Sequence, residues 1–392
     1  MNGGESMKEE KSLMSRWSRK VFALLLFLMI SHLIPTTSAR ASTFYQEDLD
    51  YSEIQGVLDE IMENDQAIDF GAYVGEIMSG KESFSIPDIS EKLISSIKGE
   101  VKANIGTFAK LLSIGLFAAI FTNLSMAFKN NQVSETGHYI TYLFLFAIII
   151  SSFVTASAIA AKTITKILTF MKVLVPAYSL SIGFCSGSTS SLLYYEVALI
   201  LVSLADLIIV KMVIPLINFY MVLMLANNLS KEDMLSRLAG LLESIIGWSL
   251  KSLLAAVVGL QAIQGLIMPV IDEVKRSALL KASETLPGIG NAFGGITETI
   301  LSAGVLLKNS IGVAGLVVIV VVCSVPILKI LIIVLIYRFS SAVLQPVSDK
   351  RITECIGASA RSTGLLLRVV IIGAVLFMLS ITIVAVSTNT AL

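Results

Sequence analysis

The feature that most constrains this chain is a series of apolar stretches, each long enough to cross a lipid bilayer. About 20 apolar residues in a helix match the roughly 30 Å thickness of the hydrocarbon core. Five such runs cover residues 104–128, 139–161, 252–272, 312–337 and 369–388. Because 55% of the 392 residues are apolar and only 15% are charged, a soluble globular protein is excluded. We predict an all-α polytopic membrane protein.

Two further apolar regions are harder to divide into spans. Residues 163–187 contain two lysines and Pro176, and residues 192–229 are 38 nearly unbroken apolar positions. One straight helix of that second length would measure about 57 Å, far more than a bilayer. We therefore expect either two spans that fold back near Lys211 or one span joined to a kinked surface segment. The preferred count is eight spans, with six or seven as the alternatives.

The N-terminus has the order of a secretory signal peptide. A basic start at residues 1–20 precedes a 14-residue, mostly apolar stretch at 21–34 and a small-x-small site at residues 39–41. The apolar run is too short for a comfortable span. We expect residues 1–41 to be a signal peptide that is cleaved after Ala41, with an uncleaved signal anchor as the alternative. Both place the following residues outside the cytoplasm.

Residues 42–103 form an acidic segment with helical periodicity. They carry 14 acidic and 4 basic side chains, whereas residues 104–392 carry 12 acidic and 19 basic ones. Ile54 and Leu58 belong to one apolar stripe, and a second stripe that starts at Ile89 runs into the first span. We expect an extracytoplasmic helical segment, which serves either as a solvated spacer or as a docking surface for a partner in the same compartment.

Basic residues set the expected orientation of the membrane domain, residues 104–392. They gather between the last two spans and before the span at 252, and basic residues favour the cytoplasmic side. An even number of spans then leaves both chain ends outside, in agreement with the signal peptide. Lys275, Arg276 and Lys281 fall on the outer side and conflict with this rule.

Two connectors on the cytoplasmic side are predicted to be amphipathic surface helices. The first begins at the capping box Ser230-x-x-Asp233 and carries an apolar face as far as Trp248. The second covers residues 340–366 and is interrupted at Pro346.

The side chains that usually carry catalysis or bind metals are scarce. The chain has two histidines and three widely separated cysteines, which match no metal or redox spacing. A histidine-based triad and a histidine-rich metal site are therefore excluded, and we expect neither a cofactor nor enzymatic activity. The glycine-rich stretch 286–299 does not predict a nucleotide site, because no Gly-Lys-Ser/Thr follows it and no strand precedes it.

The same stretch predicts a different kind of structure. Its glycines permit a sharp turn and the close approach of helices, so we expect a re-entrant or surface hairpin at 286–299 that packs against other helices. The candidate functional residues in it are Pro287, Gly288, Gly290, Gly294 and Gly295.

Ionisable residues within or near the spans are the other candidates: Lys172, Glu196, Asp206, Lys211 and Lys329. A charge at the bilayer centre costs about 2.5–3.5 kcal/mol on insertion scales and by default marks a transport pathway or a charge pair. The alternative is that Asp206 and Lys211 flank a tight turn at the outer surface. Lys329 is expected to lie deepest and is the preferred candidate for an interhelical pair.

The run LPGIGNAFGGITETILSAGVLLKNSIGVAGL at residues 286–316 closely resembles stage III sporulation protein AE of endospore-forming Firmicutes. The resemblance extends over most of the membrane domain, including residues 192–197 and the span around Pro326. The order of signal peptide, exported segment and multispan domain also agrees.

This resemblance implies a role in sporulation. Members of the family are polytopic proteins of the mother-cell membrane that surrounds the forespore. They assemble with other stage III A-operon proteins and, directly or indirectly, with forespore stage II protein Q, in a complex likened to a secretion apparatus or feeding channel. The family provides no catalytic residues, and no nucleic-acid partner is implied.

Two functions follow as hypotheses. The first is a non-enzymatic membrane subunit of that trans-envelope complex. The second is an autonomous ion-coupled transporter or permease, for which Glu196, Asp206 and the hairpin at 286–299 would form the site.

Overall fold

The computed structural model describes most of the chain between residues 50 and 387. The described ranges are 50–62, 68–80, 86–127, 131–186, 188–229, 234–283 and 290–387. The signal peptide at 1–41, the capping box that starts at Ser230, and both Pro287 and Gly288 lie outside the described residues.

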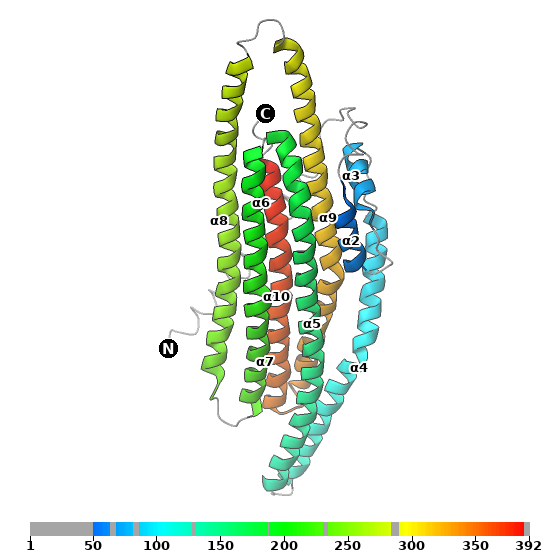
Figure 1. Cartoon of the computed structure of the whole chain (residues 1–392). Coiled ribbons are helices and arrows are strands. Elements are labelled where there is room, and N and C mark those ends of the chain that lie inside the picture. Colours follow the sequence, from blue (N-terminus) through cyan, green and yellow to red (C-terminus); the bar gives the residue numbers. More distant parts are fainter. Residues whose placement is uncertain are drawn as a thin grey trace. The chain divides into compact units, whose positions relative to one another are not determined.

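Helices make up nearly all of these described residues, and no strand occurs among them. In chain order they are α2 (Ser52–Ile61), α3 (Phe70–Met78), α4 (Ile86–Ala127), α5 (Asn131–Ser186), α6 (Ser188–Ala205), the π-helix η2 (Asp206–Val213), α7 (Ile214–Leu229), α8 (Ser236–Ser283), α9 (Gly290–Leu344) and α10 (Lys350–Ser387) (Figure 1).

Within this described part, six helical runs are long and apolar enough to cross a membrane, which confirms the all-α membrane class. They are Ile97–Ile120, Ile140–Gly183, Ser191–Leu229, Ser236–Ile267, Ser302–Leu344 and Lys350–Val386. Six is the lower end of the expected range, because apolar stretches that were expected to form separate spans are continuous helices.

The first of these continuous helices is α5. It runs for 56 residues through the lysines and Pro176 that were expected to separate two spans. Lys162 and Lys172 are exposed, and Lys166 donates a hydrogen bond to a backbone carbonyl, so none of the three needs the helix to end. A long lysine side chain can lie along an apolar surface and still keep its charge in water.

The second continuous run joins α6, η2 and α7, so the expected reversal near Lys211 is wrong. Pro215 has no N–H to donate to the carbonyl of residue 211, which would break an α-helical ladder. The chain instead widens into the π-helix, where the N–H of Ile214 bonds the carbonyl of Ile209 five residues earlier. The run therefore accommodates the proline without turning back.

The two predicted surface helices are also parts of longer helices. Residues 236–248 are the first turns of α8, which continues into its membrane span. Residues 340–366 are divided between the end of α9 and the start of α10, and the interruption at Pro346 is confirmed as the turn between them. Because two helices separate the α7–α8 turn from the α9–α10 turn, both turns lie at one end of the bundle (Figure 1).

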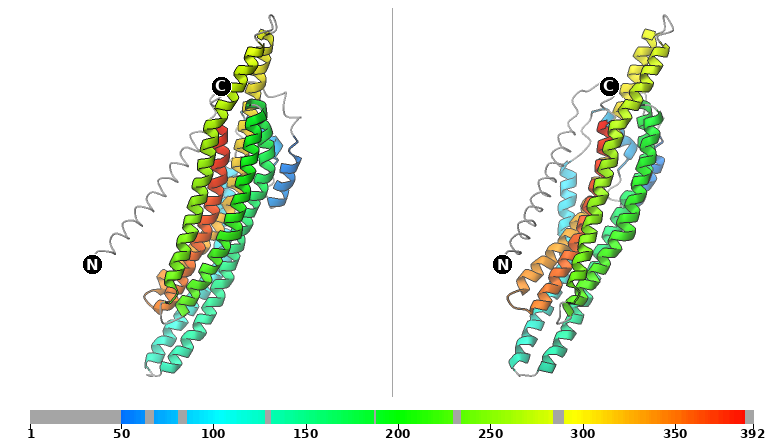
Figure 2. Two further views of the ribbon diagram at one scale, coloured as in Figure 1. Left: turned by 60° about the vertical axis from the view of Figure 1, so that its left-hand side comes forward. Right: turned by 90° about the vertical axis from the view of Figure 1, so that its left-hand side faces the viewer.

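The three basic residues that conflict with the expected orientation lie at the opposite end. Lys275, Arg276 and Lys281 are in the last turns of α8, beyond the apolar span that ends at Ile267. Both views of Figure 2 show α8 and α9 extending past the end of α10 here. The orientation of the bundle in the membrane stays a prediction.

Helices α5, α9 and α10 form the centre of the bundle and approach closely at glycines. A Cβ atom at Gly312 of α9 would lie 3.2 Å from the hydroxyl of Tyr178 on α5. A Cβ at Gly373 of α10 would lie 2.5 Å from Cδ1 of Ile164 on α5. Small residues at helix contacts are the usual means of close packing in membranes, where no hydrophobic effect drives helices together.

Buried hydroxyl groups add interhelical hydrogen bonds to this packing. The hydroxyl of Tyr142 on α5 donates to the carbonyl of Leu225 on α7. Tyr337 on α9 donates to the carbonyl of Ile149 on α5 at 3.3 Å. These contacts fix the relative height of the three helices, because each hydroxyl reaches a single backbone carbonyl.

The acidic segment is held against the bundle by α2 and α3. Ile54 and Leu58 are buried, and the ring of Phe70 lies between those of Tyr51 and Phe170, at centroid distances of 5.6 and 6.5 Å. Burial raises the pKa of the Tyr51 phenol to about 12. Within the described residues this segment is therefore a docked unit and not a detached spacer.

Two polar contacts complete the docking. The side-chain carbonyl of Gln55 accepts a hydrogen bond from the N–H of Phe70 at 2.9 Å and so joins α2 to α3. The ammonium of Lys166 on α5 donates to the carbonyl of Ile61 at the end of α2, at 2.5 Å. A cation at a helix C-terminus also interacts favourably with the helix dipole.

Gly115 on α4 provides a test of the packing. A Cβ there would lie 3.0 Å from Cγ of the buried Leu344, and both methyl groups of that leucine are closer still. We expect Gly115→Val to lower the stability of the purified protein by about 1–3 kcal/mol, as overpacking does. Gly106→Val on the same helix is the control, since a Cβ there meets nothing within 4 Å. Thermal unfolding in detergent measures both, and equal melting temperatures would contradict the close α4–α9 contact.

Candidate functional site

The ionisable residues singled out in the sequence do not form one site. Glu196 is exposed on α6, and ten residues, or about 15 Å along the helix axis, separate it from Asp206. Lys172 is exposed on α5, and Lys329 is half-buried on α9. The site of the transporter hypothesis is therefore not assembled by Glu196 and Asp206.

Asp206 and Lys211 form an ion pair with an N–O distance of 3.2 Å. Residues five apart do not face each other on an α-helix, but the wider turn of η2 brings them to one side. The two side chains are 30% and 65% exposed, respectively. No chain reversal lies between them, so the interpretation of a tight turn is wrong.

The glycine-rich stretch is only partly described. Gly290 is the first residue of α9, and Gly294 and Gly295 lie in its first turns. Among the described residues, Gly80 is the glycine with a positive φ, at 70°. The hairpin itself stays a prediction, because residues 284–289 lie outside the described part.

A different lysine lies deepest in the bundle. Lys308 on α9 is fully buried, whereas Lys329 is not. The ammonium of Lys308 is 3.4 Å from the carbonyl of Ala385 near the end of α10. Lys308 was not among the candidates named from the sequence, and the expectation of an interhelical pair for Lys329 stays a prediction. The signal that was missed is the position of Lys308 directly after Leu307, inside an apolar stripe.

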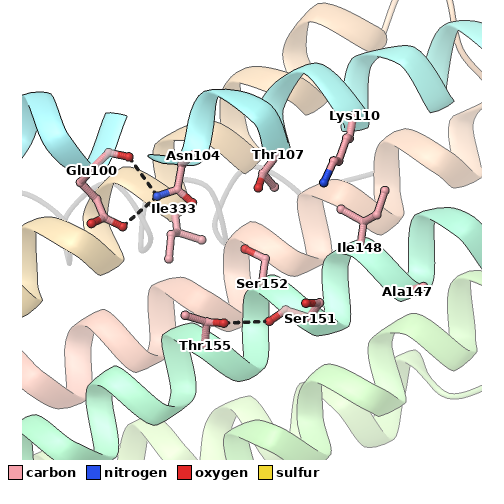
Figure 3. A pocket seen from close by; sticks show the side chains of 10 residues that line it. All are labelled: Glu100, Asn104, Thr107, Lys110, Ala147, Ile148, Ser151, Ser152, Thr155 and Ile333. Carbon is pink, nitrogen blue, oxygen red and sulfur yellow. Dashed lines mark hydrogen bonds between the residues drawn. The ribbon is translucent and has the colours of Figure 1, made fainter. Parts of the chain in front are cut away.

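A cavity with a partly polar lining lies between α4, α5 and α9. Its volume is about 370 Å³, far above the roughly 10–15 Å³ that one water molecule needs. Ten residues line it: Glu100, Asn104, Thr107, Lys110, Ala147, Ile148, Ser151, Ser152, Thr155 and Ile333 (Figure 3).

The charged groups of this polar pocket lie at its two ends. In Figure 3, Glu100 lies at the Thr155 end and Lys110 at the Ala147 end. The side-chain amide of Asn104 donates to the carboxylate of Glu100 at 2.8 Å and to its carbonyl at 3.0 Å, which fixes the carboxylate against α4. The pocket therefore presents one anion, one cation and several hydroxyl groups to a polar occupant.

Sequence spacing contains the signal for this pocket. Glu100, Asn104 and Thr107 recur at intervals of four and three, which places them on one face of the helix that contains the first span. Polar residues on one face of a membrane helix indicate a polar interior or a partner. The partner residues on α5 are serines and threonines, which occur throughout the spans and give no comparable signal.

Water in the pocket can be tested with a pair of cysteine variants on α5. Ser152 lines the pocket, and Ala156 is fully buried one turn further on. We expect Ser152→Cys to react with a water-soluble maleimide at least about tenfold faster than Ala156→Cys, because thiolate formation needs water. The unmodified protein supplies the background from its own cysteines, and equally slow labelling of both variants would show a dry pocket.

Comparison with known proteins agrees with the resemblance seen at residues 286–316. The family model for stage III sporulation protein AE matches residues 68–388, which include every helix from α3 to α10. Stage III sporulation protein AE of Bacillus subtilis (strain 168) is 27% identical over 315 residues, which cover 80% of this chain and 79% of the relative. No solved structure matches the chain. This membrane protein therefore belongs to the stage III sporulation protein AE family.

Proposed function

We propose that this chain is a non-enzymatic subunit of a trans-envelope complex between mother cell and forespore. Family membership supports a role in sporulation. The finer proposal concerns how the chain acts: as one membrane component of a larger conduit, and not as an independent carrier or enzyme.

The observation that carries this proposal is the length of the apolar helices. The runs Ile140–Gly183, Ser191–Leu229 and Ser302–Leu344 contain 44, 39 and 43 residues. At about 1.5 Å per residue they are roughly 58–66 Å long, about twice the hydrocarbon thickness. One bilayer therefore covers only half of each run.

Large apolar side chains are nevertheless exposed along both halves. Val154 and Phe219 are exposed towards the end of the bundle with the α7–α8 turn, and Leu192 and Ile200 towards the other end. Extended exposed apolar surface marks contact with lipid or protein. A subunit packed against neighbouring proteins satisfies this requirement, whereas a carrier that acts alone leaves half of the surface in water.

The proposed neighbours are other stage III A-operon proteins and, directly or indirectly, forespore stage II protein Q, in the mother-cell membrane around the forespore. The docked α2–α3 segment offers them an acidic surface. Its exposed carboxylates include Glu53, Asp59, Glu60, Asp69 and Glu76. Residues 50–80 contain no lysine or arginine, so a basic partner in the same compartment would be complementary.

One observation favours the alternative of an ion-coupled transporter. The polar pocket has the charged and hydroxyl groups from which a solute site is built. The two functions differ in what the isolated chain does. A transporter moves a solute when reconstituted alone in vesicles, and a subunit does not.

Photo-crosslinking in sporulating cells tests the proposal. A photoreactive residue in place of Ile200, which is 61% exposed, is expected to form covalent adducts with another stage III A-operon protein. A photoreactive residue at Glu354, on the exposed surface near the α9–α10 turn, is the control for non-specific capture. Heat-resistant spore counts verify that each variant remains functional. Solute uptake by the purified chain alone, without protein adducts at Ile200, would favour the transporter.

A further inference from the structure

A contact between α5, η2 and α10 defines a reference height along the bundle, which we call the three-helix level. The Cβ position of Gly373 on α10 is 2.5 Å from Cδ1 of Ile164 on α5 and 3.9 Å from Cδ1 of Ile209 on η2. Lys162 and Lys211 lie two residues from Ile164 and Ile209, about 3 Å along each axis. Both are displaced towards the end of the bundle that carries the α7–α8 turn, and both are exposed.

Lys251 on α8 lies close to the same level. Tyr220 donates a hydrogen bond to Glu243 at 3.2 Å, and Gln261 donates to Ser380. Tyr220 lies eleven residues below Ile209, and Ser380 lies seven residues above Gly373. The same numbers of residues, counted up α8 from Glu243 and down α8 from Gln261, both reach residue 254, which therefore lies at about the three-helix level. Lys251 is therefore about 5 Å below that level, on the same side as the first two cations, and it is exposed.

Helix α9 contributes Lys329. The Cβ position of Gly315 lies 2.7 Å from Leu174 of α5, and Tyr337 bonds the carbonyl of Ile149. Counted from the first contact, Lys329 lies four residues below the three-helix level, and counted from the second it lies seven residues below. The separation is therefore roughly 6–10 Å.

The last two helices, α10 and α4, also carry a cation near this level. Arg368 on α10 lies five residues below Gly373 and is exposed. On α4, exposed Lys98 lies two residues beyond Glu100, which is at the Thr155 end of the polar pocket (Figure 3). Each of the six membrane runs thus contributes at least one cation within roughly 3–10 Å of one level, and α5 also carries Lys166, about 3 Å on the other side of it.

We call this set the basic belt: Lys98, Lys162, Lys211, Lys251, Lys329 and Arg368. Two carboxylates lie beside these cations: Asp206, which pairs with Lys211, and Glu100, which is two residues from Lys98 on α4. The acidic side chains of α2 and α3 lie further along α5, beyond Lys166, towards the opposite end of the bundle. The belt therefore has a large excess of positive charge.

Two features identify the belt as a membrane boundary. Trp248 is 73% exposed one turn before Lys251, and tryptophan and basic residues both favour the interface between headgroups and hydrocarbon. Below the belt, α5 and the run through η2 and α7 contain uncharged apolar stretches of 22 and 18 residues, at 140–161 and 212–229. These stretches are about 27–33 Å long and fit one bilayer.

The position of the first span indicates which half of the bundle the bilayer surrounds. The run Ile97–Ile120 on α4 begins at the belt and extends only towards the α7–α8 turn. On the other side of the belt, the acidic segment α2–α3 packs against α5 around Phe170. Hydrocarbon does not accommodate a segment with exposed carboxylates, so the bilayer lies on the α4 side.

We propose that the basic belt binds the phosphate groups of anionic phospholipids, and that the bilayer surrounds only the half of the bundle between the belt and the α7–α8 and α9–α10 turns. The long side chains extend along the apolar surface and place their charges at the headgroups. The polar pocket then lies near mid-bilayer, and the other half of α5, α6, α9 and α10 projects beyond the membrane. This placement does not depend on the proposed complex.

Lipid-dependent stability of the purified full chain tests the belt. We expect phosphatidylglycerol to raise the melting temperature in detergent by roughly 3 °C more than phosphatidylcholine with the same acyl chains. The combined variant Lys162→Gln, Lys251→Gln and Arg368→Gln removes three belt cations without breaking the Asp206–Lys211 pair, and is expected to lose at least half of that difference. The control, Lys275→Gln with Arg276→Gln and Lys281→Gln, makes the same change of charge at the far end of α8 and is expected to keep it.

Other outcomes would overturn the proposal. An unchanged phosphatidylglycerol response in the belt variant, or the same loss in the control, would show that the belt is not the binding site. An equal shift produced by inorganic phosphate alone would show a phosphate site that does not mark the membrane.

Discussion

The structure depends on one constraint: three of the six apolar runs in its described part are about twice as long as a bilayer is thick. Membranes require a helix to satisfy its backbone internally, but they set no upper limit on its length. The run from α6 to α7 continues because the π-helix absorbs Pro215, and α5 continues because its lysines reach the surface or a carbonyl. The part of each helix that extends beyond the bilayer then needs another contact for its apolar surface, which neighbouring subunits provide in the proposed complex.

Close packing at a few points holds these long helices in register. Gly312 and Gly373 let α9 and α10 approach α5, and buried tyrosine hydroxyls tie α5 to α7 and α9 at defined heights. The register matters for function, because it aligns cations from different helices into one belt. It also positions α4 beside α5, where Glu100 and Lys110 define the polar pocket.

The sequence predicted local features well and long-range ones poorly. Apolar periodicity predicted helices, Pro346 predicted the turn before α10, and residues 286–316 predicted the family. The predicted span boundaries were wrong because a charge or a proline inside an apolar run does not always end the helix. Whether it does depends on what the side chain reaches. Spacing marks one face of α4 as polar, but the burial of Lys308 and the α5 side of the polar pocket depend on which helices become neighbours. Hydropathy along one chain does not contain that information.

Spin labels on the two halves of the bundle test the placement of the bilayer most directly. Val154 and Ile200 are both exposed, at 57% and 61%, and lie on opposite sides of the basic belt. In reconstituted membranes, a label at Val154→Cys should be relaxed mainly by oxygen, which concentrates in hydrocarbon. A label at Ile200→Cys should be relaxed mainly by a water-soluble nickel complex. Oxygen-dominated relaxation at Ile200 would contradict the account, because it would place the bilayer across the centre of the bundle or on its other half.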